Sequence, residues 1–122
     1  MGLCIYQRKS SFSISNDKVE EAASALEQLR VANKEHRKDV LTFSPQEKLN
    51  KNFYYWRSIF KADGSVIDLK FIAEKKYCGE EEDLKAIAPF VKDGSWIEMQ
   101  DEDDVKFRWI FDNGVLRERK VR

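Results

Sequence analysis

The feature that most constrains the fold is an alternating apolar segment near the C-terminus that runs into a tight-turn signal. Apolar residues fill every second position of this segment, namely Val105, Phe107, Trp109 and Phe111. A period of two is typical of a strand that buries one face. Asn113-Gly114 follows, and this dipeptide is favoured in two-residue hairpin turns. The chain must therefore fold back at once, and residues 115–121 are predicted to form an antiparallel, basic edge strand.

Other segments carry similar strand and turn signals. Asp63-Gly64 is a second hairpin signal, between a strand that ends at Lys61 and a return strand over 66–72. A strand that contains Trp96, Ile97 and Met99 precedes an acidic turn over 101–104. Near-alternating apolar residues predict an N-terminal strand that bends around residues 9–11; they are Leu3, Ile5, Phe12 and Ile14.

The first helix is predicted over residues 17–34. Asn16 and Asp17 offer N-cap oxygens, and Glu20 stands at the capping-box distance from Asp17. The apolar stripe of this helix has the spacing of one helical face and consists of Val19, Ala22, Ala23, Leu26 and Leu29.

A second helix begins at a clear capping box. Ser44 is the predicted cap, Pro45 suits the first helical position, and Glu47 completes the box. The aromatic run that follows fits a helix or a strand, and a helix from Pro45 to about residue 55, then a strand, reconciles both signals. Residues 40–43 are predicted to be a strand or a packed connector. Whether Tyr54, Tyr55 and Trp56 belong to the core or to an exposed surface stays open.

A third helix follows Gly79 and is limited by Pro89, with a stop at Asp93-Gly94. The predicted order is strand–helix–helix–strand–strand–helix–strand–strand–strand. The strand-to-strand links after the second helix are short turns, apart from the third helix. We therefore expect one α+β domain over residues 1–122, with a mostly antiparallel sheet of five to six strands and two to three helices on one face.

No residue pattern indicates catalysis or metal binding. The single histidine, His36, lies in a run of charged residues, and no nucleophile or acid motif accompanies it. No pair of Cys or His residues has zinc-ligand spacing, and the glycines form no phosphate-binding loop. We expect a protein that is not an enzyme, with no cofactor and no metal.

The N-terminal sequence and the cysteines favour a cytoplasmic protein. Cys4 and Cys78 suit two free thiols of a reducing compartment, and one bridge between them is the alternative. Gly2 followed by Cys4 resembles an acylation signal, but Tyr6 stands where the myristoylation pattern requires Ser or Thr. No signal peptide or membrane-length apolar run is present, so no membrane partner is expected.

Charge is distributed unevenly along a chain whose formal net charge is zero. Residues 79–104 contain 2 basic and 10 acidic side chains, whereas residues 105–122 contain 6 basic and 2 acidic side chains. The first block predicts an acidic face that docks on a basic surface of another protein, or a solvated helix start and turn. The predicted partner-binding residues are Glu80, Glu81, Glu82, Asp83, Asp101, Glu102, Asp103 and Asp104.

The basic C-terminal segment supports an alternative function. Basic and aromatic residues on a sheet can bind single-stranded nucleic acid through phosphate contacts and stacking. A structural interpretation is that charged residues protect an edge strand while the aromatic residues face the core. The predicted nucleic-acid-binding residues are Arg108, Arg117, Arg119, Lys120 and Arg122.

The segments Leu84–Met99 and Phe107–Phe111 resemble a module of small uncharacterised α+β proteins of bacteria and their phages or mobile elements. The resemblance covers about a quarter of the chain, and its motif carries no known chemistry. The loop Gln100–Asp104 lacks the glycines of that module, so no functional residue is carried over. The resemblance implies an inhibitor-like or immunity-like protein, for example an anti-defence protein that blocks a bacterial nuclease. Homo-oligomerisation through an edge strand remains open.

Overall fold

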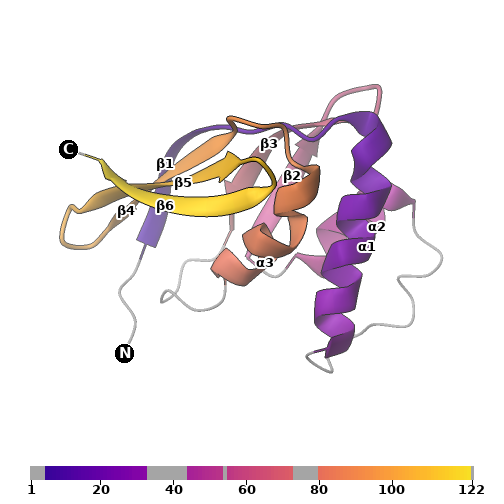
Figure 1. The fold of residues 1–122 in the computed structure, drawn as a ribbon, viewed down its shortest axis with the longest axis horizontal. Helices are drawn as coiled ribbons and strands as arrows, with labels where there is room; N and C mark the ends of the chain where they lie inside the picture. The colour runs from indigo at the N-terminus through magenta and orange to yellow at the C-terminus, as the bar shows by residue number, and fades with distance from the viewer. Residues whose placement is uncertain (1–4, 33–43, 54, 73–79, 122) are drawn as a thin grey trace.

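A computed structural model describes residues 5–32, 44–53, 55–72 and 80–121 and confirms the α+β class and the predicted element order (Figure 1). The elements are β1 (Ile5–Ser11), α1 (Asn16–Ala32), α2 (Pro45–Asn52), β2 (Trp56–Phe60), β3 (Val66–Phe71), α3 (Glu80–Ile87), the 3-10 turn η2 (Ala88–Phe90), β4 (Trp96–Asp101), β5 (Lys106–Asp112) and β6 (Val115–Val121). The sequence expectations for residues 40–43, Cys4, Cys78, His36 and Tyr54 fall outside the described residues.

The strands form two antiparallel sheets rather than one. A four-stranded sheet has the order β1-β4-β5-β6, and β2 and β3 form a separate pair. In the sequence, 84 residues lie between the end of β1 at Ser11 and the start of β4 at Trp96. Their pairing places the N-terminal strand β1 beside the C-terminal strands β4, β5 and β6 in one sheet.

Side-chain amides take the place of a backbone ladder at both edges of the two-stranded sheet. Towards β1, the Gln7 amide donates to the Leu69 carbonyl at 2.8 Å and accepts from the Phe71 N–H at 2.8 Å. Towards α2, Asn50 Oδ1 accepts from the Ser58 N–H at 2.7 Å. Each amide offers the donor and acceptor of a peptide group, so it satisfies a strand edge without adding a strand.

The predicted hairpin turns are present. Asn113 and Gly114 both have positive φ, 51° and 77°, as a type I′ turn requires. Gly64 has a φ of 90° in the β2–β3 turn. In the acidic turn, Asp104 also has a positive φ of 63°, and the Asp101 carboxylate accepts from the backbone N–H of Val105 at 3.0 Å.

The two helix starts differ in how well sequence patterns predicted them. The capping box of α2 is confirmed, since Ser44 accepts from the Glu47 N–H and the Glu47 side chain accepts from the Ser44 N–H. The start of α1 was predicted one residue too late. Because α1 begins at Asn16, Asp17 lies inside the first turn, where its carboxylate accepts from the Ser15 hydroxyl at 2.7 Å.

One hydrophobic core joins the helices to both sheets. Trp56 is buried, which answers the question that its sequence context left open. Its ring lies 5.9 Å from that of Trp109 on β5 and 5.1 Å from that of Phe71 on β3. The buried faces of the helices complete this core with Val19, Ala22, Ala23, Leu26, Leu49, Leu84 and Ile87. The opposite face of the four-stranded sheet is therefore the one that can meet solvent.

Candidate functional site

The predicted acidic face is divided between two places in the fold. Glu80–Asp83 begin α3, whereas Asp101–Asp104 form the turn between β4 and β5. Figure 1 shows this turn at the far left end of the hairpin, away from α3, which lies below the middle of the molecule. The two groups do not combine into one continuous surface.

Asp83 is a correction to the predicted partner-binding set. Its side chain is 1% exposed, and its Oδ1 accepts from Nη2 of Arg30 on α1 at 2.6 Å. Arg30 also donates from Nε to the Asn52 carbonyl at 2.8 Å. A carboxylate enclosed in this way connects α3 to α1 and is inaccessible to a partner.

The other acids of α3 differ from one another. Glu81 Oε1 accepts from Trp109 Nε1 at 3.2 Å, and its Oε2 lies 3.2 Å from Lys85 Nζ. Glu82 is exposed. The side chain of Glu80 is outside the described part of the structure. Glu81 thus has a structural contact with the core tryptophan, and Glu82 is the exposed acid among the three whose side chains the structure describes.

In the β4–β5 turn, two of the four acids support the turn itself. Asp101 accepts from the N–H groups of Asp103 and Val105, and Asp104 accepts from Gln100 Nε2 at 2.7 Å. Glu102 and Asp103 are exposed at the tip. The turn is therefore an ordered structure in which Glu102, Asp103 and Asp104 are all exposed, and Asp104 also supports the turn through Gln100.

A second charged surface lies on the outward face of the four-stranded sheet, and we call it the basic face. Its members alternate with the core-facing residues of β4 and β5 and continue onto β1 and β6 through the strand register. They are Tyr6, Arg8, Lys9, Ser11, Trp96, Glu98, Gln100, Lys106, Arg108, Ile110, Asp112, Val115, Arg117, Arg119 and Val121. Six of these side chains are basic and two are acidic.

Glu98 is at the centre of the basic face. Its Oε2 accepts from Arg8 Nε at 3.2 Å and its Oε1 accepts from Arg108 Nε at 2.9 Å. The residue is only 3% exposed, because these long side chains cover it. Burial acts to raise the pKa of Glu98, but the Arg108 hydrogen bond and the nearby charges of Lys9 and Arg108 outweigh it and lower that pKa. The carboxylate stays ionised and holds two guanidinium groups in place.

The two arginines keep donors available to solvent. Arg108 stacks 4.0 Å above the Trp96 ring, and its side chain is 32% exposed. Arg8 donates from Nη1 to Gln100 at 2.8 Å and is 39% exposed. Within the described residues, both terminal nitrogens of Arg108 and Nη2 of Arg8 have no hydrogen-bond partner. Such fixed, planar donors suit phosphate oxygens.

The structure brings together part of the predicted nucleic-acid-binding set. Arg119 lies opposite Arg108 in the register, and Arg117 lies opposite Ile110, so these three arginines share the basic face. Lys120 lies opposite the buried Phe107 and belongs to the other face of β6, which is a correction. Arg122 falls outside the described residues.

Sequence reasoning missed the contribution of β1 to this surface. Tyr6 pairs with Gln100, and Lys9 pairs with Glu98, across an irregularity between Gln7 and Lys9. Tyr6 is 49% exposed, which leaves its ring accessible for stacking. The alternation of the N-terminal strand contained this signal, but only the pairing of β1 with β4 shows which surface these residues join.

Comparison of the chain with protein-family models, with curated proteins and with solved structures gives no match. Within the described ranges, no group of three or more His, Cys, Asp or Glu residues has the arrangement of a metal site. Among those same residues, no helix has the length and apolar composition needed to cross a membrane.

Proposed function

We propose that this protein binds single-stranded nucleic acid on its basic face. The observation that carries the proposal is the arrangement of Arg8 and Arg108 around Glu98 on an outward sheet face, beside an exposed Tyr6. Arginine donors of fixed orientation can contact successive phosphates, and aromatic rings can stack on bases. Proteins that bind single strands without sequence preference combine these two elements.

The chemistry of the face favours a single strand over a duplex. A duplex hides its base faces, so an accessible ring would contribute little to binding it. On a single strand, each stacked base contributes about 1–3 kcal/mol, and the phosphates add a salt-dependent term. The net charge of the whole chain is zero, so attraction to the polyanion has to come from this local surface.

A binding assay with a matched control tests the proposal. We expect Arg117→Gln/Arg119→Gln to weaken binding of a fluorescein-labelled oligothymidylate of about 12 nucleotides by at least about tenfold. The control is Arg57→Gln/Lys70→Gln, which removes two exposed positive charges from the β2–β3 sheet. Equal affinities for the two variants would show that net charge, and not the basic face, governs binding.

A protein-binding inhibitor or immunity function is the second candidate, and the ordered β4–β5 turn favours it. Glu102 and Asp103 are exposed at a tip that the Asp101 carboxylate stabilises. Charge reversal with Glu102→Lys/Asp103→Lys should abolish capture of a stoichiometric protein partner from nuclease-treated bacterial lysate. The same capture should persist with Arg117→Gln/Arg119→Gln. If both variants still capture the partner, the acidic turn is not the surface that binds it.

A further inference from the structure

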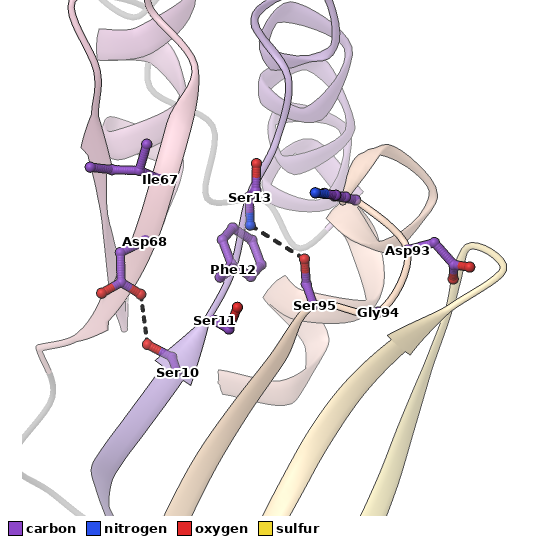
Figure 2. Close-up of a pocket in the computed structure, with 10 residues that line it drawn as sticks. Ser10, Ser11, Phe12, Ser13, Ile67, Asp68, Asp93, Gly94 and Ser95 are labelled. Carbon is purple, nitrogen blue, oxygen red and sulfur yellow. Dashed lines mark hydrogen bonds between the residues drawn. The ribbon is translucent and has the colours of Figure 1, made fainter.

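We propose that a polar cavity between β1 and β3 binds a small zwitterion, a molecule that carries both an ammonium and a carboxylate group. The cavity has a volume of about 490 Å³ and lies where residues 10–13, β3 and the loop before β4 meet (Figure 2). A free amino acid and a short peptide with both termini free share the required chemistry. This inference is independent of the proposed binding of nucleic acid.

The cavity arises from the division of the sheet. At one end, Ile14 and Val66 form a backbone pair with hydrogen bonds of 3.1 and 2.9 Å. At the other end, the Gln7 amide bridges to β3, and the Ser10 hydroxyl donates to Asp68 Oδ1 at 2.6 Å. Between these two connections the strands separate. The fold therefore holds the walls of the cavity in place without a ligand.

Two opposite charges border the cavity from different walls. Asp68 stands on β3, and Lys92 stands on the loop before β4, with residues 10–13 between these segments in Figure 2. Asp68 Oδ1 is occupied by Ser10 and by the Leu69 N–H at 2.8 Å, but Oδ2 has no hydrogen-bond partner within the described residues. Over those residues Lys92 likewise has no ion pair. The two groups are thus available to a ligand and do not neutralise each other.

The loop that carries Lys92 is fixed by backbone contacts. The Lys92 N–H donates to the Ser13 carbonyl at 2.8 Å, and the Ser13 N–H donates to Ser95 Oγ at 3.3 Å. Asp93 is directed away, towards the β5–β6 turn in Figure 2, where it accepts from the Asn113 N–H at 2.7 Å. Of the three charged residues that line the cavity, Lys92 and Asp68 therefore remain as the two that are available to a ligand.

Hydroxyl groups supply the remaining recognition. Ser11 and Ser13 are among the residues that line the cavity, and their Oγ atoms have no hydrogen-bond partner in the described part of the chain. Hydroxyls both donate and accept, so they can complete the bonding of either end of a zwitterion. A ligand with one charge would leave Asp68 or Lys92 without a charged partner. Charge-assisted hydrogen bonds at both ends therefore select for a molecule with both charges.

Matched probes test the required charges by nuclear magnetic resonance. Glycine and triglycine carry both charges, triglycinamide carries the ammonium alone, and N-acetyl-triglycine carries the carboxylate alone. We expect the two zwitterions to shift the backbone amide signals of Ser11, Ser13 and Asp68 with dissociation constants of about 1 mM or below, and the singly charged probes to bind at least about fivefold more weakly. Tighter binding of glycine would identify a free amino acid as the ligand, and tighter binding of triglycine would identify a short peptide with both termini free.

Two conservative variants complete the test. Asp68→Asn keeps an oxygen that can accept from Ser10, and Lys92→Gln alters an exposed side chain, so both should fold. Each should lower the affinity for the better zwitterion about tenfold, whereas Lys85→Gln on α3 should leave it unchanged. The inference is overturned if no localised shifts occur, if singly charged probes bind equally well, or if the two variants bind like the wild type. The variant Arg117→Gln/Arg119→Gln should retain zwitterion binding, so failure of one proposal is distinguishable from failure of the other.

Discussion

Asp83 and Glu98 are both buried carboxylates that pair with arginine, and the arginines differ in how much of each side chain is exposed. Asp83 pairs with Arg30 between α3 and α1, and the Arg30 side chain is 5% exposed. Glu98 pairs with Arg8 and Arg108, whose side chains are 39% and 32% exposed. The first pair is enclosed within the core, and the second presents unused donors to solvent. The same chemistry thus connects two helices in one region and leaves exposed donors on a sheet surface in the other.

The largest expected effect concerns the enclosed pair. Asp83→Ala removes a buried carboxylate that pairs with the Arg30 guanidinium, so the free energy of unfolding should fall by about 3–5 kcal/mol. Urea denaturation followed by circular dichroism measures this change. Asp103→Ala in the exposed turn is the control and should change the free energy of unfolding by no more than about 0.5 kcal/mol. If Asp83→Ala changes the free energy of unfolding only slightly, Asp83 does not have the structural role that separates it from Glu98.

The second prediction concerns the pair on the basic face. Glu98→Gln/Arg108→Gln leaves the net charge of that face unchanged but removes a fixed guanidinium, so oligothymidylate binding should weaken about tenfold. Fluorescence anisotropy measures the affinity. Glu27→Gln/Lys48→Gln removes an ion pair elsewhere, also with no change of net charge, and should bind like the wild type. Equal affinities for the two double variants would contradict a role for the Glu98–Arg108 geometry.

A smaller effect is expected from pH. The pKa of Glu98 is lowered in the folded state, so its stabilising contribution is present above the unfolded pKa near 4.5 and is lost as pH falls through the folded pKa. Glu98→Gln should therefore lose less stability than the wild type as pH falls from about 6 to about 3. Denaturant midpoints measured across this range test the sign. A steeper loss for the variant would contradict the lowered pKa.

The smallest effect is expected at the tip of the acidic turn. Glu102→Lys/Asp103→Lys retains the Asp101 contacts that hold the turn, so the free energy of unfolding should change by no more than about 0.5 kcal/mol. Thermal unfolding provides the measurement. A large loss of stability would show that these two carboxylates have a structural role like that of Asp83.

Local patterns were sufficient to predict the elements and most turns. The alternation of Phe107, Trp109 and Phe111 predicts β5, and Asn113-Gly114 predicts the turn that follows, because both depend on near neighbours in the chain. The capping box at Ser44 predicts the start of α2 for the same reason. The division of the sheet was not predictable in this way, because it depends on side-chain amides that reach strand edges distant in the sequence.

The candidate site was only partly predictable. Arg108, Arg117 and Arg119 are close in sequence and were identified together, whereas Arg8 joins them through the pairing of β1 with β4. The inward direction of Asp83 had a detectable signal, since it lies four residues before the buried Ile87 on α3. Its partner Arg30 lies 53 residues away, and only the packing of α3 against α1 brings the two together.

The most direct test of the basic face as a nucleic-acid-binding surface is the salt dependence of oligothymidylate binding. Affinities of the wild type and of Arg117→Gln/Arg119→Gln should be measured by fluorescence anisotropy between about 50 and 200 mM salt. Each phosphate contact on a single strand contributes about 0.7 to the slope of log affinity against log salt, so we predict that the variant's slope is smaller by about 1.4. An unchanged slope, or no binding by the wild type at the lowest salt, would contradict the proposed function.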